Sequence, residues 1–503
     1  MRSFRCAFAA ILLVFVAGCG GPVEPRSGVQ SDDDNPAIDT LFAVWDAPGS
    51  PGCALAVAQH GALLYSRGYG YANLDYNIPI TPQTVFDVAS ITKQFNAASL
   101  TMLEQDGKLS LDDNVRKWLP ELPEFEAPIT LRHMIYHTSG LRDYLNLFPL
   151  AGRGDYFPIS HAQILAMMAR QRALIFPPGD QYLYSNTAYM LLAQVVERAG
   201  GQPLGEMTRD RIFKPLAMVG SRMYDNFDEI IPQRATGYDR DDEGGMRVVH
   251  NYNFDVAGDG QLYSTVEDLL RWDNYLHGTA KPPIYQSMMT EGTLNNGEAI
   301  GYAQGIVISD YRGMRTAGHS GSSWGFRSQL VRFVDPGLSI AIACNSDFAR
   351  PGELAQRVAD HYLADQLDPL NLDEEIIVDQ TDIDEPLESL SLTAEELAHF
   401  AGEFFSAELD ANYRFTVIAD DLVVHIEQEP PLLVTPVAND RFNIRFYNQG
   451  WSGPQTATLE FNRDRSGTVT GFALSSGSER GIVFEKWQRS CPMGKSCSAA
   501  PGM

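Results

Sequence analysis

The sequence predicts an α/β chain, of the α+β kind, with an antiparallel sheet flanked by helices and a helical subdomain, followed by an all-β domain. Strand-like patterns stand at both ends of residues 37–364, with helical patterns between them, which suggests such a sheet. From residue 397 onward, short alternating strands are separated by turns every roughly 8–12 residues, as in a sandwich or barrel. The 503 residues also exceed what one core holds, about 250–300 residues.

Two hairpins are expected in the first domain. Apolar or alternating runs surround the turns His60-Gly61 and Asp335-Pro336-Gly337, which is a hairpin signal. The strands predicted by these runs cover residues 53–58, 62–65, 328–334 and 338–343.

Two helices are expected between the hairpins. One pattern opens at Ser90, continues to Glu104 and stops at Asp106-Gly107. The other covers residues 186–199 and is ended by Gly200-Gly201. Glycine after the last periodic residue is a helix stop signal.

The second half of the chain changes in composition. Residues 365–396 are rich in acid without an apolar period, which predicts a solvated linker and lacks the spacing of a calcium loop. An all-β domain is expected over residues 397–489, with a tail at 490–503. Its predicted strands lie within residues 414–418, 422–426, 442–446, 457–461, 469–472 and 481–484.

The N-terminal residues 1–19 have the pattern of a signal peptide. Arg2 and Arg5 precede an apolar core too short to span a bilayer. Val16-Ala17-Gly18-Cys19 resembles a bacterial lipobox, so Cys19 is expected to carry a lipid anchor that faces the periplasm, with the outer membrane favoured. A plain secretory signal is the alternative, and both export the chain. Residues 20–36 are expected to be a flexible tether.

The net charge of -26 argues against nucleic-acid binding, which needs a basic surface.

Cys53 and Cys344 lie in strand-like apolar runs, so they are expected to be buried hydrophobes rather than a pair, although export permits a disulfide. Cys491 and Cys497 flank a short segment in the tail, and the sequence is compatible both with a local bridge and with two free thiols. No cysteine has metal-ligand spacing, and no metal or cofactor is predicted.

Ser90-Ile91-Thr92-Lys93 contains the first candidate catalytic pair. A serine hydroxyl needs a neighbouring base to become a nucleophile, and in a helix a lysine three residues on lies on the same face. At the helix N-terminus, the Ser90 amide is an unsatisfied donor suited to an oxyanion. Burial of Lys93 would lower its pKa below about 10.4 and free the amine to accept a proton.

Two later motifs supply the partners for this pair. Tyr184 and Asn186 point the same way in an extended stretch. Tyr184 is a second candidate base and an acid for the leaving group, and Asn186 can contact both Lys93 and substrate. On a predicted strand, His319 offers a donor or titratable charge, Gly321 leaves room for a substrate, and the Ser322 amide is a second oxyanion donor.

These motifs, with the His137-Thr-Ser-Gly-Leu141 and Gly68-Tyr-Gly-Tyr-Ala segments, make the chain resemble the serine β-lactamase and penicillin-binding-protein family. The similar branch holds class C β-lactamases, D,D-carboxypeptidases, D-aminopeptidases and esterases. The resemblance covers about residues 37–365, and the tail domain is similar to lipocalin-like β-barrels. It implies that Ser90 is the nucleophile, Lys93 and Tyr184 transfer protons, and Asn186 orients the substrate.

The resemblance implies a serine hydrolase that forms an acyl-enzyme with a peptide or other small-molecule substrate, and the N-terminal pattern implies that it is exported. The third motif is His-Ser-Gly, whereas antibiotic-hydrolysing members have Lys-Thr-Gly. A permanent cation is thus replaced by a weaker, titratable group, which favours D-residue peptides, small esters or amides over β-lactams. The alternative function is a non-catalytic envelope binding or scaffold protein that retains the fold.

Two further patterns compete with this interpretation. Gly321-Ser322-Ser323-Trp324-Gly325 matches a nucleophile elbow around Ser323, but an elbow needs a following helix and a strand pattern follows here. His133 and His137 have zincin spacing, yet Met134 replaces the required glutamate. A helix that ends near residues 138–140 is the better interpretation.

Overall fold

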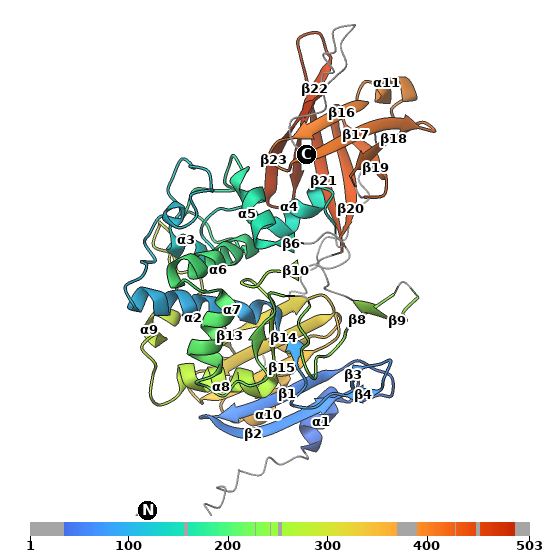
Figure 1. Cartoon of the computed structure of the whole chain (residues 1–503). Helices are drawn as coiled ribbons and strands as arrows, with labels where there is room; N and C mark the ends of the chain where they lie inside the picture. The colour runs from blue at the N-terminus through green and yellow to red at the C-terminus, as the bar shows by residue number, and fades with distance from the viewer. Residues whose placement is uncertain are drawn as a thin grey trace, which may run out of the picture.

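The computed structural model describes residues 35–154, 159–226, 228–241, 243–249, 254–369, 390–427, 429–448 and 453–487. The predicted signal peptide with Cys19, most of the tether and of the acidic linker, and the Cys491 and Cys497 pair lie outside these residues. Two bodies are visible, a mixed domain of helices and sheet and a strand-rich C-terminal body above it (Figure 1). The exact domain boundaries stay predictions, because residues 370–389 are not described.

A six-stranded antiparallel sheet forms the centre of the first domain. In spatial order its strands are β12 (Val307–Tyr311), β13 (Met314–Ser323), β14 (Phe326–Phe333), β15 (Leu338–Cys344), β1 (Cys53–Gln59) and β2 (Ala62–Tyr69). The two predicted hairpins are therefore present, and the first joins the last through the β1–β15 pairing. Both strands of this pairing are buried almost throughout, because helices cover both faces of the sheet.

Cys53 and Cys344 lie opposite each other in the β1–β15 register and form a disulfide. Both cysteines are fully buried, as predicted, but the prediction that they do not pair is wrong. The register between two strands that lie 291 residues apart decides this contact. Neither apolar run contains that information alone.

Alternate side chains of the central strands serve two different cores. Leu55 and Ile340 pack with Val358 in one core, under α1 (Pro36–Phe42) and α10 (Pro351–Tyr362). Ala54 and Ala341 belong to the other core, on the side of α8 (Val266–His277). This two-sided burial is the reason why the strands read as continuous apolar runs rather than as alternating ones.

The helical subdomain is built around α2 (Thr92–Gln105) and α6 (Asn186–Gly200), which pack against each other. Both predicted helices are thus found, and Gly201 ends α6 in the left-handed region with φ 77°. The smaller helices of the subdomain are α3 (Leu131–Ile135), α4 (Tyr144–Leu150), α5 (His161–Ala169) and α7 (Leu204–Thr208).

The C-terminal body is a closed barrel of eight strands, each paired with its neighbour in sequence. Its strands are β16 (Gly402–Ser406), β17 (Ala411–Ile418), β18 (Asp421–Ile426), β19 (Leu432–Ala438), β20 (Arg441–Asn448), β21 (Gly453–Arg463), β22 (Val469–Ser476) and β23 (Glu479–Lys486). Closure through the β16–β23 pairing leaves no free sheet edge. The predicted barrel is confirmed, although β16 and β19 correspond to no predicted strand.

Aromatic rings fill the inside of the barrel. Phe472 stacks on Phe484 with ring centroids 4.4 Å apart, and Phe404 lies 5.4 Å from Phe472. The buried rings on the described barrel strands are Phe404, Tyr413, Phe415, Phe442, Phe446, Phe461, Phe472 and Phe484, and the buried ring of Phe400 packs against two of them. The interior is therefore a packed core and not a ligand-holding cup.

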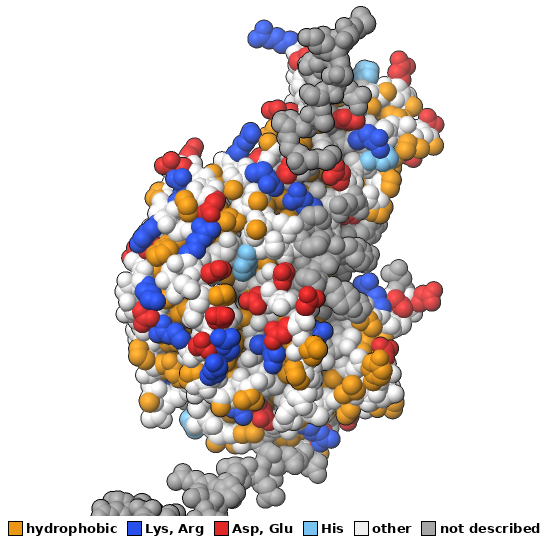
Figure 2. Space-filling view, viewed as in Figure 1, with side chains coloured by type: hydrophobic (Ala, Val, Ile, Leu, Met, Phe, Trp, Pro, Cys, Tyr) orange, Lys and Arg blue, Asp and Glu red, His pale blue; other side chains and the backbone are white. Residues whose placement is uncertain are grey.

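Acidic and basic side chains are interspersed on the face of the molecule shown in Figure 2. No helix within the described part of the chain is both long and apolar enough to cross a bilayer.

Candidate active site

Ser90 lies in a short 3-10 turn, Ala89–Ile91, immediately before α2. Ala89 has φ 48°, a left-handed value that is uncommon for alanine. The carboxylate of Asp87 accepts a hydrogen bond from the Ala89 N–H at 2.8 Å. This contact holds the backbone just before Ser90, whose half-buried side chain lies at the start of the helix as predicted.

Lys93 lies beside Ser90 and is completely buried. Its Nζ atom is 3.2 Å from Ser90 Oγ, 2.9 Å from Asn186 Oδ1 and 2.8 Å from the carbonyl oxygen of Asp259. Burial lowers the pKa of Lys93 to about 8, against the opposing charges of Asp259 and Asp143. An amine with this pKa can accept the proton of Ser90 near neutral pH.

Tyr184 covers the lysine. Lys93 Nζ lies 4.7 Å from the centroid of the Tyr184 ring. Burial raises the pKa of Tyr184 well above 10, and Ser90 counteracts this only in part. Tyr184 is therefore a neutral phenol in the resting site, which suits a proton donor better than a base.

Asn186 is the first residue of α6, and the Ser185 side chain caps this helix. The Asn186 N–H donates to Asp143 Oδ2 at 2.5 Å, and its side-chain oxygen accepts from Lys93. Asn186 is therefore held by Asp143 through its backbone and by Lys93 through its side chain, and the contact with Lys93 agrees with the prediction from the sequence.

His319 lies on β13 and is 5% exposed. Its Nδ1 atom is 2.6 Å from the Ser320 carbonyl oxygen, and its Nε2 atom is 3.1 Å from Tyr302 Oη. Burial, with the charge of Lys93, lowers its pKa to about 4. His319 faces Tyr184, with ring centroids 6.0 Å apart, but it is neutral at physiological pH and supplies no cation.

Gly321 has a packing role that was not predicted from the sequence. A Cβ atom at this position would lie 2.2 Å from Val88 O and 2.2 Å from Ser328 Oγ. The glycine thus allows β13 to pack against the backbone that precedes Ser90, and its predicted contact with a substrate stays a prediction. This close approach also brings Ser322, the next residue on β13, toward the Ser90 turn.

Replacing Gly321 by alanine is expected to lower the free energy of unfolding by about 1–3 kcal/mol, because the added methyl group overpacks the contact with Val88. Urea denaturation measures the difference in the free energy of unfolding. Gly352→Ala in α10 is the matched control, since its Cβ would meet nothing closer than 3.6 Å. A Gly321→Ala protein as stable as this control would contradict the packing interpretation.

Three residues contact the site without having been given a role in it from the sequence, although His137 belongs to a segment that carries the family resemblance. Asp143 binds the Asn186 N–H, Asp259 binds Lys93 through its carbonyl oxygen, and His137 Nδ1 accepts from the Ser185 N–H at 3.0 Å. Asp143 caps α4, so an aspartate before an apolar helical run was a signal for its structural position. Asp259 stands between two glycines, which is a weak signal.

The competing patterns have other structural roles. Ser323 Oγ donates to Asp87 Oδ2 at 2.7 Å, and strand β14 follows it, so the context of a nucleophile elbow is absent there. His133 Nδ1 accepts from Thr130 N in a capping box, whereas His137 lies beyond the end of α3. No group of three metal-ligating side chains is found in the described ranges.

A pocket of about 210 Å³ opens at the second motif. Tyr184 and Asn186 line it from the first domain, and the barrel supplies Gln455, Ser478 and Glu479. The complete lining also includes Leu141, Asp143, Leu145, Asn146, Ile175 and Leu183. The lining includes two carboxylates and no lysine or arginine, and it does not include Ser90, Lys93 or His319.

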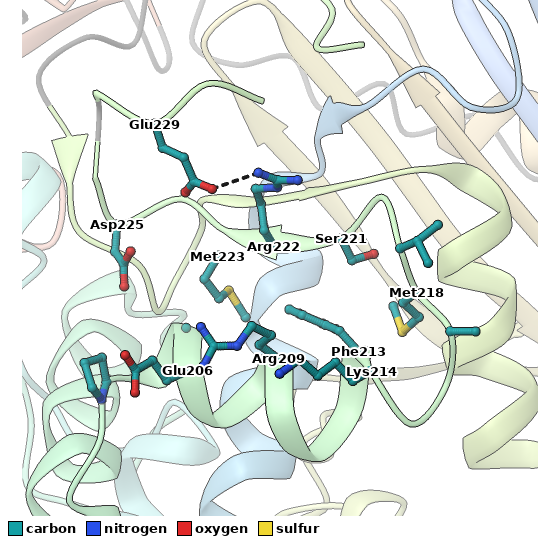
Figure 3. Close-up of a pocket in the computed structure, with 14 residues that line it drawn as sticks. Glu206, Arg209, Phe213, Lys214, Met218, Ser221, Arg222, Met223, Asp225 and Glu229 are labelled. Carbon is teal, nitrogen blue, oxygen red and sulfur yellow. Dashed lines mark hydrogen bonds and ion pairs between the residues drawn. The ribbon is translucent and has the colours of Figure 1, made fainter. Parts of the chain in front are cut away.

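A larger cavity of about 800 Å³ lies elsewhere, between α7, the following turn of helix, residues 217–225 and Glu229 (Figure 3). Arg222 and Glu229 form an ion pair at 2.8 Å on one side of it, and Glu206, Arg209 and Lys214 lie on the other. None of the predicted site residues lines this cavity.

Comparison with known proteins gives concordant results. Residues 38–364 match the protein family described as Beta-lactamase. The chain is 30% identical over 349 residues to penicillin-binding protein 4* of Bacillus subtilis, covering 65% of this chain and 76% of that protein. It is 30% identical over 325 residues to a D-aminopeptidase of Gluconobacter oxydans, covering 64% of this chain but only 60% of that protein.

Solved structures share the fold. The octameric penicillin-binding protein homologue from Pyrococcus abyssi aligns with a TM-score of 0.57 at 22% identity, over 89% of this chain and 98% of its own. The D-amino acid amidase from Ochrobactrum anthropi aligns with a TM-score of 0.54 at 25% identity, over 65% of this chain and 98% of its own.

Proposed function

This chain belongs to the β-lactamase family, as a serine hydrolase of the β-lactamase and penicillin-binding-protein type, and from this premise we propose that it hydrolyses amide or ester bonds through an acyl-enzyme on Ser90. The observation that carries the proposal is the contact of 3.2 Å between Ser90 Oγ and the fully buried amine of Lys93. Such a pair of nucleophile and base is the minimum that acyl transfer requires.

In the proposed reaction, neutral Lys93 takes the proton of Ser90 while Oγ attacks the carbonyl carbon. The backbone amides of Ser90 and Ser322 bind the oxyanion that forms. Tyr184 donates its proton to the departing amine or alkoxide and recovers one from the Lys93 ammonium. Water then attacks the acyl-enzyme, and the same groups return Ser90 to its starting state.

We propose peptides or amides of D-residues as the substrate class, with small esters as secondary substrates. Two relatives support this class by their names, the D-aminopeptidase and the D-amino acid amidase. The neutral state of His319 disfavours substrates that present a carboxylate. β-Lactams and carboxyl-terminal D-peptides are therefore expected to be poor substrates.

The test is activity-based labelling of the purified protein together with a substrate panel. We expect a fluorophosphonate probe to label Ser90, as shown by peptide mapping, and D-amino-acid p-nitroanilides to be hydrolysed faster than their L-enantiomers and faster than nitrocefin. A protein that is neither labelled nor active on any of these compounds contradicts the proposal.

We further propose that the protein is exported and anchored to the membrane through a lipid on Cys19. The buried Cys53–Cys344 disulfide supports export, because disulfides persist in oxidising compartments. Radiolabelled palmitate is expected to enter the wild-type protein and the Cys6→Ser control but not a Cys19→Ser variant. Label retained in Cys19→Ser would contradict the anchor.

A further inference from the structure

The barrel is joined to the first domain by buried polar contacts. Arg142 Nη1 and Glu408 Oε2 form an ion pair at 2.7 Å, with side chains 4% and 5% exposed. Arg142 Nη2 also donates to the Arg480 carbonyl oxygen at 2.9 Å. Figure 1 shows the barrel on the side of the first domain that carries α4 and α5. Buried charges of this kind require a fixed partner, so the two bodies are held in register.

Glu479, the first residue of β23, is completely buried at this contact. Its Oε1 atom accepts a hydrogen bond from the Asp143 N–H at 3.0 Å. Its Oε2 atom accepts from Asn146 Nδ2 at 3.0 Å and from Ser478 Oγ at 2.8 Å. Both oxygens are therefore engaged with protein donors, and two of those donors belong to the first turn of α4 or its cap.

The segment held by Glu479 leads directly to the catalytic groups. Asp143 Oδ2 accepts the Asn186 N–H, and the Tyr144 N–H donates to Thr187 Oγ1 at 2.7 Å. Tyr144 Oη donates to Asp259 Oδ2 at 3.0 Å, and the carbonyl oxygen of Asp259 binds Lys93. The same short segment thus contacts both the second motif and the residue that supports the lysine.

We propose that Glu479 of the barrel is a positioning residue of the active site, which fixes the segment around Asp143 and through it Asn186 and Lys93. The inference rests on the proposed function, because it assigns a role in the same reaction. The barrel then completes the active site rather than forming a separate binding module. A displacement of about 1 Å at a reacting group can cost 10²-fold in rate, so one contact of this kind is sufficient to matter.

The test compares three variants of the full chain. Glu479→Ala removes both acceptor oxygens. Glu479→Gln keeps one oxygen that accepts from the Asp143 N–H, and its NH2 group can donate to Asn146 once the Asn146 side-chain amide has flipped. Glu460→Ala is the matched control, because its barrel carboxylate is 62% exposed and lies 3.7 Å from Arg441 at the surface. Each protein is assayed for hydrolysis of a D-amino-acid p-nitroanilide, for fluorophosphonate labelling of Ser90 and for thermal unfolding.

We expect Glu479→Ala to lower kcat/KM by about 10²-fold, while Glu479→Gln and Glu460→Ala stay within about threefold of wild type. The labelling rate of Ser90 should fall less than amide turnover in Glu479→Ala, because the small probe depends less on Asn186. If Glu479→Ala does not fold, Asp143→Asn is tested in its place. This variant keeps the backbone N–H that Glu479 binds. Its side-chain NH2 cannot accept a hydrogen bond, so the N–H of either Asn186 or Leu145 loses its acceptor.

The inference is overturned if Glu479→Ala, or its substitute Asp143→Asn, retains turnover within about threefold of wild type. It is also overturned if Glu479→Gln is as inactive as Glu479→Ala, because hydrogen bonding would then not be the cause. A failure of the proposed function gives a different pattern, in which the wild-type protein itself is neither labelled nor active.

Discussion

Replacing Ser90 by alanine is expected to lower kcat/KM for D-amino-acid amides by about 10⁴-fold or more, because removal of a catalytic nucleophile abolishes the covalent route. The lysine at 3.2 Å would then have no hydroxyl to deprotonate. The backbone amides at residues 90 and 322 would remain and leave only weak residual catalysis. Initial rates measure the loss of turnover, and intact-protein mass spectrometry after fluorophosphonate treatment measures the loss of covalent labelling.

Ser323→Ala is the control for this experiment. Ser323 matches the competing nucleophile pattern, yet its hydroxyl donates to Asp87 and is 5% exposed. We expect this variant to be labelled at Ser90 and to retain most of its turnover. Covalent label on Ser323, or a Ser90→Ala protein with wild-type turnover, would contradict the assignment of the nucleophile.

Replacing Lys93 by methionine is expected to lower kcat/KM by about 10³-fold, within the range attributed to general base catalysis. Methionine keeps the buried bulk but carries no amine to accept the Ser90 proton. Since the lysine pays a desolvation cost in the folded protein, the variant is expected to unfold at a temperature no lower than wild type. Steady-state kinetics and calorimetry test the two statements separately.

The pH dependence of kcat/KM is expected to show that Lys93 is the base. Only the neutral amine of Lys93 accepts a proton, and burial lowers its pKa to about 8. The kcat/KM of the wild-type enzyme should therefore rise as pH increases through about 8 and then level off. His319, with a pKa of about 4, should contribute no limb in this region.

Tyr184→Phe provides the comparison for this profile. Because Tyr184 is a neutral phenol whose pKa is raised by burial, its loss should slow the reaction by about 10–10²-fold and leave the limb near pH 8 in place. A limb that disappears in Tyr184→Phe would instead make the tyrosine the base.

The sequence was most informative where chemistry and local structure coincide. Ser90 and Lys93 are one helical turn apart, and Asn186 follows a capping serine, so short-range spacing was sufficient to place each side chain. The hairpins and the two long helices were predicted for the same reason. The strand β19 was missed because Pro431 and Pro436 stand next to or within it, and proline weakens a strand prediction.

Features that depend on register or on distant packing were not predictable from one sequence. The Cys53–Cys344 bridge requires the pairing of β1 with β15. The role of Gly321 depends on Val88, which lies on another segment. Asp143 and Glu479 meet only because the barrel docks on α4, and neither residue stands in a motif that would identify it.

The adjacency of β1 and β15 also has a consequence for how the chain reaches its native state. β1 cannot pair with β15 until residue 344 has been synthesised, 291 residues after residue 53. Topologies of such high contact order gain stability late, after long loops have been closed. The first domain therefore becomes compact late in synthesis, and its disulfide can form only after both strands have been made.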